Sequence, residues 1–325
     1  MMFDGFANVW TPVMLHRKIG ARPVRTVLAG VPLVLFRGKG GRLGALIDRC
    51  PHRGVALSLG RVTDDGCLEC PFHGWRFDPC GENHHVPLNP DAKTARLGAQ
   101  ALPIRRIGDL VWVYTAAGAE HVPEPGVPAG LADPGLARCY VERLWACHWT
   151  RAMENMLDSP HLPFVHRRTI GGSMRARMTA RSRLEVEWED RPWGGVSRAN
   201  LDGERNEAFL EFHRPNMMSL HIPIPGKILG IHALVIPADT GATRLLVVGS
   251  RSFLRWPILG PLFGRLNGAI AAEDRAVVES SGPDEVPPPG EEPSVATDRA
   301  TLQFRKYYYE TLRPSRMGGG ATAER

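Results

Sequence analysis

Two short segments near the N-terminus each pair a cysteine with a histidine. The first reads Cys50-Pro-His52-Arg-Gly and the second reads Cys70-Pro-Phe-His73-Gly-Trp, with seventeen residues between His52 and Cys70. Thiolate sulfur and imidazole nitrogen are common protein ligands of iron and zinc. Each segment therefore offers one thiolate and one imidazole, and we expect Cys50, His52, Cys70 and His73 to hold one metal centre together.

The order of these ligands separates two kinds of metal centre. A Rieske [2Fe–2S] cluster needs two thiolates on one iron and two imidazoles on the other. A zinc site with two cysteines and two histidines uses the same residue types, but zinc fingers group the cysteines together and the histidines together. Here cysteine and histidine alternate, and prolines and glycines shape two tight loops. The pattern favours a Rieske cluster, with zinc as the alternative.

Cys67 and Cys70 also form a Cys-x-x-Cys pair. A thioredoxin-like redox pair lies at the start of a helix in a strand-helix-strand unit, and no such pattern surrounds Cys67. We expect Cys67 to be a buried strand residue. The remaining cysteines are expected to be small apolar residues, namely Cys80, Cys139 and Cys147.

A second group of polar residues follows later in the chain and comprises Asn155, Asp158, His161 and His166. On an unbroken helix, two histidines five residues apart would point about 140° away from each other, at ~100° per residue. Pro163 lies between them, and we expect the helix to break there because proline removes a donor and clashes with the preceding turn. Both imidazoles could then face one point, and Asp158 could share a face with His161.

Asp274 is the predicted third ligand of a mononuclear iron. An Fe(II) oxygenase site needs two histidines and one carboxylate, with positions left open for O₂. Asp274 lies within an apolar stripe of a predicted helix, where a carboxylate is costly unless it is paired or binds a metal. The stripe consists of Ile270, Ala271, Val277 and Val278. Pairing of Asp274 with a buried arginine is the alternative.

Other polar residues near these ligands have more ordinary interpretations. Asn155 and Asp158 could cap a helix or lie on its surface, and His148 is expected to support the site rather than bind metal. The charged residues that fall outside the apolar stripe are expected to be solvated, namely Glu273, Arg275 and Glu279.

The elements that must position these residues fall into two predicted domains. Residues 119–135 are rich in proline and glycine, which marks a boundary, so we expect domains at 1–118 and 119–325. The first is predicted to be β structure, with strands at 24–28, 32–36 and 45–48 separated by Gly-rich turns.

The second domain is predicted to mix helices and strands. Apolar residues at i, i+4, i+7 and i+11 predict a helix over 144–158. Strand-like runs occupy 180–255, and further helices are expected at 262–280 and 298–312. Residues from Gly318 onward are expected to fray.

The composition is that of an ordinary globular protein. The 325 residues are 43% hydrophobic and 23% charged, which allows a sizeable core. Apolar runs fall short of the roughly 18 residues that a membrane helix needs, and no signal-peptide pattern opens the chain. We therefore expect no membrane partner and a cytoplasmic location. The net charge of +6 comes from scattered arginines, which argues against nucleic acid but could steer an acidic electron-transfer partner.

Taken together, these motifs resemble the Rieske-type aromatic-ring-hydroxylating oxygenase family, above all its shorter members of the vanillate and dicamba O-demethylase type. The likeness rests on Cys-x-His-x₁₇-Cys-x-x-His and on Asn-x-x-Asp-x-x-His-x₄-His. It implies an α+β fold, in which an N-terminal all-β Rieske domain precedes a larger catalytic domain with an antiparallel sheet covered by helices. The implied ligands of the [2Fe–2S] cluster are Cys50, His52, Cys70 and His73. The implied ligands of a mononuclear Fe(II) are His161, His166 and Asp274.

The resemblance also implies a head-to-tail homotrimer. In it, an aspartate matching Asp158 bridges His73 of one subunit to an iron-ligating histidine of its neighbour. Asp158 is therefore a catalytic candidate, with Asn155 beside it. Electrons from NAD(P)H would arrive through a separate flavin reductase, a ferredoxin or both. The sequence agrees, because no Gly-x-Gly-x-x-Gly follows a predicted strand to hold nicotinamide or flavin.

The expected activity is that of the oxygenase component of a Rieske non-haem iron system. It would use O₂ for C–H hydroxylation, or for oxidative O- or N-demethylation, of an aromatic or polycyclic small molecule. Ring cis-dihydroxylation is the main alternative, and an electron carrier with only the cluster is a further one. The sequence does not name the substrate. Its expected pocket region includes Asn216, Met217, Met218, His232 and Trp256.

Overall fold

Two compact units make up the chain. The computed structural model describes residues 2–314, and one unit ends at Pro125 while the other begins at Gly126. This division falls inside the Pro- and Gly-rich segment 119–135, whereas the sequence placed the boundary at the start of that segment. The fraying expected from Gly318 onward concerns residues outside the described range. No helix among the described residues is long and apolar enough to cross a membrane.

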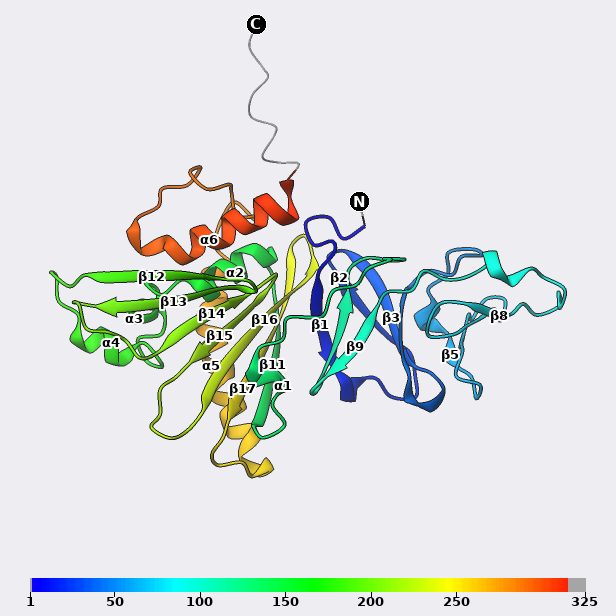
Figure 1. Cartoon of the computed structure of the whole chain (residues 1–325), viewed down its shortest axis with the longest axis horizontal. Coiled ribbons are helices and arrows are strands. Elements are labelled where there is room, and N and C mark those ends of the chain that lie inside the picture. The colour runs from blue at the N-terminus through cyan, green and yellow to red at the C-terminus, as the bar shows by residue number, and fades with distance from the viewer. Residues whose placement is uncertain (1, 315–325) are drawn as a thin grey trace, which may run out of the picture. The chain divides into compact units, whose positions relative to one another are not determined.

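The first unit contains three small antiparallel sheets (Figure 1). In sheet order, their strands are β1 (Trp10–Leu15), β10 (Leu110–Tyr114) and β9 (Ile104–Ile107), then β2 (Val24–Leu28), β3 (Val31–Arg37) and β4 (Leu43–Ile47), then β5 (Arg61–Val62), β6 (Leu68–Glu69), β7 (Arg76–Phe77) and β8 (Asn83–His85). The strands predicted at 24–28, 32–36 and 45–48 are confirmed, the third ending one residue early. One cysteine-histidine segment follows β4, and the other lies between β6 and β7.

The first unit's apolar core includes the two cysteines of these segments. Cys50 and Cys70 are buried in one cluster with residues that come mainly from β3, β4, β6 and β7. The other members are Val34, Phe36, Leu46, Leu57, Leu68 and Phe77. Full burial of a large apolar side chain contributes about 1.5–3 kcal/mol. The packing that holds the sheets together therefore also fixes the positions of both cysteines.

One seven-stranded antiparallel sheet forms the frame of the second unit. In sheet order, its strands are β11 (Ala137–Trp145), β17 (Ala242–Arg251), β16 (Leu229–Asp239), β15 (Met217–His221), β14 (Phe209–His213), β13 (Gly194–Leu201) and β12 (Leu184–Arg191). The strand-like region 180–255 supplies all of them except β11. The expected α+β class, with an all-β first unit and an antiparallel sheet with helices in the second, is confirmed.

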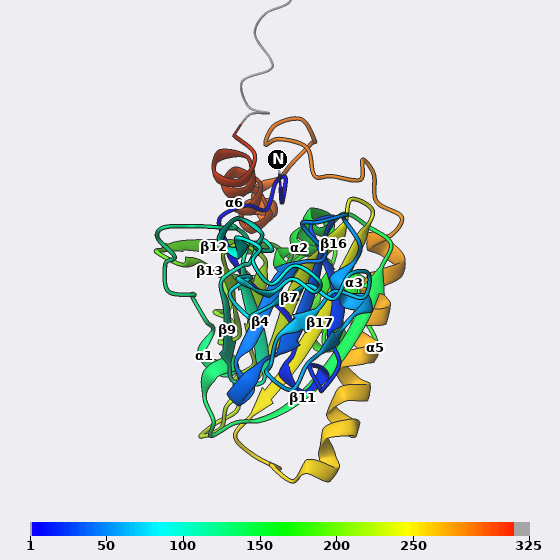
Figure 2. The same ribbon diagram turned by 90° about the vertical axis from the view of Figure 1, so that its right-hand side faces the viewer.

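The helices belong to the second unit. They are α1 (Ala129–Ala132), α2 (Trp149–Leu157), α3 (Leu162–Val165), α4 (Gly172–Arg177), α5 (Gly260–Val278) and α6 (Arg299–Tyr307), the last followed by a π-helical turn at Tyr308–Leu312. Figure 2 shows α5 running beside β11, and α2 packs against β15, β16, β17, α5 and α6. The helices predicted at 262–280 and 298–312 are confirmed.

The helix expected over 144–158 begins only at Trp149. Trp145 instead ends strand β11, where it pairs with Thr243 of β17. The spacing of the two tryptophans fits a helical period, but pairing in the sheet buries Trp145 completely. Local periodicity therefore gave way to a long-range contact at this end of the predicted helix.

Candidate metal centres and their pocket

The two cysteine-histidine loops share one backbone geometry. In the first loop, the N–H of Cys50 donates to the carbonyl of Val55 at 2.8 Å, and the N–H of Gly54 donates to the carbonyl of Cys50 at 2.9 Å. The second loop repeats both bonds, from Cys70 at 2.8 Å and from Gly74 at 3.1 Å. The two glycines have φ of +72° and +71°, which glycine adopts without strain. The loops are therefore matching turns.

The four predicted cluster ligands lie on these turns. Cys50 and Cys70 are at most 3% exposed, and burial, with a contribution from the Cys70 thiol, raises the pKa of Cys50 to about 11. The rings of His52 and His73 have centroids 4.6 Å apart. The ring of His52 also stacks on Trp75, at the same separation and with an interplanar angle of 2°.

This donor set fits a [2Fe–2S] cluster. A buried thiol with a raised pKa stays protonated unless a nearby cation converts it to the thiolate that binds metal. Nδ1 of His52 is buried and has no hydrogen-bond partner, so this nitrogen is available to bind a metal. Cys67 is buried just before β6 and lies outside both turns. The first unit thus presents two thiols and two imidazoles on paired loops.

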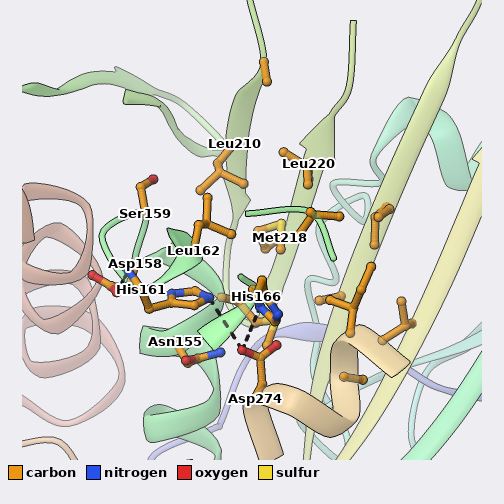
Figure 3. Close-up of a pocket in the computed structure, with 18 of the residues that line it drawn as sticks. Asn155, Asp158, Ser159, His161, Leu162, His166, Leu210, Met218, Leu220 and Asp274 are labelled. Atoms are coloured by element: carbon orange, nitrogen blue, oxygen red, sulfur yellow. Dashed lines mark hydrogen bonds and ion pairs between the residues drawn. The ribbon is translucent and has the colours of Figure 1, made fainter. Parts of the chain in front are cut away.

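Three predicted ligands from distant parts of the chain come together in the second unit (Figure 3). Nε2 of His166 lies 3.0 Å from Oδ1 of Asp274, and Nε2 of His161 lies 3.5 Å from the same oxygen. One ligand atom of each residue lies within 4.8 Å of the other two. Two imidazoles and one carboxylate thus face a common point.

Two further carboxylates hold the imidazoles through their other nitrogens. Nδ1 of His166 lies 2.8 Å from Oε2 of Glu273, which also accepts from the hydroxyl of Thr169 at 2.7 Å. Nδ1 of His161 lies 3.1 Å from Oδ2 of Asp158, which also accepts from the backbone N–H of His161 at 3.0 Å. An N–H donated from Nδ1 leaves a lone pair on Nε2, which is the arrangement of metal-binding histidines.

A cation fits between these three side chains. Asp274 is 4% exposed, and its Oδ1 has no hydrogen-bond partner although both Nε2 atoms face it. Lone pairs that face each other across 3.0 Å repel unless positive charge lies between them. Burial lowers the pKa of His166, but Asp274 and Glu273 outweigh burial and raise it overall. Among the described residues, Asp274 has no arginine partner, so the alternative of a buried ion pair is not met.

Pro163 does not break a helix between the two histidines as expected. Helix α2 ends at Leu157, and the separate turn α3 contains Pro163 near its start, where the missing N–H costs little. His161 and His166 are the N-cap and C-cap of this single turn. The imidazoles converge because each lies just outside the same short helix. At the other end of α2, His148 is the N-cap, and its side chain accepts from the backbone N–H of Thr150.

Three expectations for α5 and the residue that ends it are wrong. Glu273 is not solvated, because adjacent helical positions lie ~100° apart and this places it against the far nitrogen of His166. Val277 does not belong to the buried stripe and is 52% exposed, whereas Ile270, Ala271 and Val278 are buried. Arg275 is exposed as expected. Glu279 is not solvated either, because it is half-buried and accepts from the backbone N–H of Ala146. The sequence offered one signal for Glu273, its adjacency to Asp274.

A cavity of about 120 Å³ adjoins the three converging side chains. It lies between one face of the sheet and helices α2 and α5, and Figure 3 shows Leu210, Met218 and Leu220 across from the histidines. Asn155 reaches it from α2, and the Nδ2 of Asn155 is buried without a hydrogen-bond partner. The cavity therefore combines an apolar wall with a polar end.

The pocket region expected from the sequence is largely wrong. Of its five residues only Met218 lines the cavity. Met217 precedes it on the same strand and points to the opposite face, because side chains alternate along a strand. His232 is buried on that other face between Ser219 and another serine, and burial lowers its pKa to about 3. Asn216 is fully buried away from the cavity, and Trp256 is 68% exposed.

The fold and the two ligand sets define a protein of the Rieske oxygenase class. Residues 9–97 match the description "Rieske [2Fe-2S] domain", and residues 145–313 match "Vanillate O-demethylase oxygenase C-terminal domain". The second match covers more than half of the chain. The chain therefore belongs to the Rieske oxygenases of the vanillate O-demethylase type, as its motifs indicated, and its N-terminal unit is a Rieske [2Fe–2S] domain.

Its relatives include O- and N-demethylases. The oxygenase component of dicamba O-demethylase from Stenotrophomonas maltophilia is 31% identical over 192 residues, 55% of this chain and 51% of that protein. Methylxanthine N3-demethylase NdmB from Pseudomonas putida is 26% identical over 327 residues, 93% of this chain and 88% of the relative. A solved structure of Pseudomonas putida NdmB has a TM-score of 0.79 at 25% identity, covering 96% of this chain and 92% of that one. The matches span about half the length of several curated relatives, including the dicamba protein.

Proposed function

We propose that this protein is the oxygenase component of a Rieske non-haem iron system. In this proposal it uses O₂ and electrons from a separate reductase to act on an aromatic or polycyclic small molecule. The reaction is C–H hydroxylation or oxidative O- or N-demethylation. The observation that carries the proposal is the convergence of His161, His166 and Asp274 at one end of an apolar cavity. An electron carrier would need neither this ligand set nor a cavity beside it.

His161, His166 and Asp274 would hold a mononuclear Fe(II). Two imidazoles and a carboxylate leave further coordination positions open, and iron bound there would supply the activation of O₂. Asp158 and Glu273 have a positioning role, because each accepts the Nδ1 proton of one histidine and so directs Nε2 toward Asp274. The ligand set would thus be oriented before any substrate binds.

The cavity wall orients the substrate and excludes water. Apolar side chains opposite the histidines offer dispersion contacts to a ring and no hydrogen bonds to water. Exclusion of water strengthens the charge interactions at the polar end. We also assign Asn155 to catalysis, because its buried Nδ2 can donate a hydrogen bond to a ligand there.

Cys50, His52, Cys70 and His73 would hold the [2Fe–2S] cluster of the Rieske domain, which passes single electrons. NAD(P)H would supply them through a flavin reductase, a ferredoxin or both, and the net charge of +6 favours an acidic partner. NAD(P)H as the electron source fits a cytoplasmic location. Neither a nucleic acid nor a membrane takes part in the proposed reaction.

We further propose that the working form is a head-to-tail homotrimer in which Asp158 links the two kinds of centre. Its carboxylate contacts His161, yet the side chain remains 26% exposed. In the proposed trimer, the exposed part of Asp158 would contact His73 of a neighbouring subunit. The mass of the iron-loaded protein in solution tests the trimer.

The proposed function is tested by product analysis with the iron-loaded protein, NAD(P)H and a purified reductase. O₂ uptake and formaldehyde release are measured over methoxy-, N-methyl- and unsubstituted aromatic and polycyclic compounds. Formaldehyde in proportion to O₂ establishes demethylation, and one added oxygen atom establishes hydroxylation. Two added oxygen atoms and two hydrogen atoms establish cis-dihydroxylation instead. Substrate-dependent O₂ uptake that is unchanged in Asp274→Ala would contradict the assignment of the ligands.

A further inference from the structure

The sheet presents one continuous apolar wall to the cavity. Side chains alternate along each strand, so every second residue of β13 to β17 faces the same side. In register across β13, β14, β15 and β16, Ser197 pairs with Leu210, Leu210 with Leu220, and Leu220 with Ile231. A parallel row contains Met218, Ala233 and Val247. All of these residues line the cavity.

Ser197 is the exception in this wall. Among the cavity-lining residues that lie on the described strands, it alone has a polar side chain. It is 1% exposed, and its Oγ has no hydrogen-bond partner. A buried hydroxyl without a partner costs free energy that a ligand with a matching group recovers. Ser197 lies on β13, at one end of the row that continues through Leu210 and Leu220.

No cation lines the cavity in the described part of the chain. Its charged side chains are the carboxylates of Asp158 and Asp274, and no lysine or arginine accompanies them. A divalent ion held by the ligand set would already be balanced by these two acids. An anionic substrate would therefore enter the cavity without a counter-charge from a lysine or arginine side chain, at a large cost in desolvation.

We infer that the substrate is an uncharged ring compound with a hydrogen-bonding group, and that the hydroxyl of Ser197 meets that group. This inference rests on the proposed function and specifies its substrate class. The cavity of about 120 Å³ is close in size to the dry, apolar cavity of roughly 150 Å³ that binds benzene in another protein. A substrate with one ring, or two compact rings, matches that space. Carboxylated aromatics are excluded by charge rather than by size.

The test measures binding without turnover, on iron-loaded protein under nitrogen and without reductase. The probes are 4-methoxybenzamide, its carboxylate counterpart 4-methoxybenzoate, and methoxybenzene, which lacks the extra polar group. Calorimetry gives each dissociation constant, and the iron content of the same sample is recorded. We expect the amide to bind at least about tenfold more tightly than the carboxylate, because only the latter buries a charge.

The variant Ser197→Ala should weaken binding of the amide about threefold to tenfold, the value of one neutral hydrogen bond, and leave methoxybenzene unchanged. The matched control is Ser219→Ala. Ser219 is a buried serine on β15 that points to the opposite face and bonds to His232. Binding in this control should equal that of the wild type. Equal effects of both substitutions would reject the role of Ser197.

Tighter binding of the carboxylate, or failure of both neutral probes to bind, would overturn the inferred substrate class. That failure differs from failure of the proposed function. A protein that turns over carboxylates with O₂ would disprove the substrate class and leave the oxygenase standing. A protein that binds neutral rings, holds its iron and never consumes O₂ would disprove the oxygenase and leave the inferred ligand class standing.

Discussion

The two ligand sets of this chain are built in opposite ways. The cluster ligands lie on two neighbouring turns with the same hydrogen bonds and the same glycine conformation, so each turn is specified by a few consecutive residues. The mononuclear set joins both ends of the turn α3 to α5, and six of the seven strands of the sheet, β12 to β17, lie between them in the sequence. The cluster ligands depend on local turn geometry, whereas the mononuclear set depends on how α5 packs against the turn α3. Damage to one should therefore leave the other intact.

The largest effect is expected from Cys70→Ser. Loss of one thiolate should abolish the cluster, its visible absorption and all turnover. The iron that two thiolates would hold keeps only one of them. The second unit should still bind about one iron per chain. The matched control is Cys67→Ser, a buried cysteine outside the turns, which should retain the cluster spectrum. Loss of iron from both units in Cys70→Ser would contradict their independence.

Asp274→Ala is expected to have the next largest effect. It should lower turnover at least about a thousandfold and leave the cluster spectrum unchanged, since the carboxylate contacts only the second ligand set. Oxygen uptake and visible absorption are measured on the same preparation. Arg275→Ala serves as the control, because Arg275 follows Asp274 on the same helix and is exposed, so its loss should not affect turnover. A changed cluster spectrum would show that the two centres are not separate.

Glu273→Ala should weaken iron binding in the second unit about tenfold to a hundredfold, the usual effect of removing the partner of a ligating histidine. Competition with a chelator measures the affinity, and the melting temperature of the iron-free protein should change little. Glu273→Gln should recover most of the loss, because its amide oxygen still accepts from His166. Glu279→Ala removes the acid at the C-cap of α5, six residues after Glu273, and should leave the affinity unchanged. An equal loss in Glu273→Gln would indicate that charge, not orientation, is what Glu273 supplies.

The smallest effects are expected in the paired turns. Gly54→Ala and Gly74→Ala each force a side chain into positive φ, at a cost of about 1–2 kcal/mol of stability. Gly74→Ala should cost more, because its new methyl group would lie 3.0 Å from Pro87, whereas at Gly54 the neighbour is a flexible arginine at 3.3 Å. Denaturant unfolding measures the difference. Gly20→Ala, which has open space and an ordinary φ, should be neutral.

The sequence was most informative where function depends on neighbours in the chain. The alternation of cysteine and histidine predicted paired loops before any fold was known, and the structure has two matching turns there. Asp274 was chosen because a carboxylate in an apolar stripe needs a cation, and its burial supports that choice. The helices predicted at 262–280 and 298–312 are also present, as α5 and as α6 with the π-helical turn that follows it.

The sequence was least informative where tertiary contacts decide. Trp145 has a helical spacing, yet its partner in the sheet is supplied by β17. Glu273 looked solvated because the histidine that it contacts comes from a remote turn. A single step along β15 separates Met218, which lines the cavity, from Met217, which does not. The cavity wall could not be predicted without the register of five strands, so Ser197 carried no signal in the sequence.

The central claim is that one chain assembles two separate iron centres. It is tested most directly by the iron and acid-labile sulfide content of the purified wild-type protein and of Asp274→Ala. We predict about three irons and about two sulfides per wild-type chain, and about two irons with unchanged sulfide in the variant. Zinc in place of iron, or equal iron in both proteins, would contradict the account.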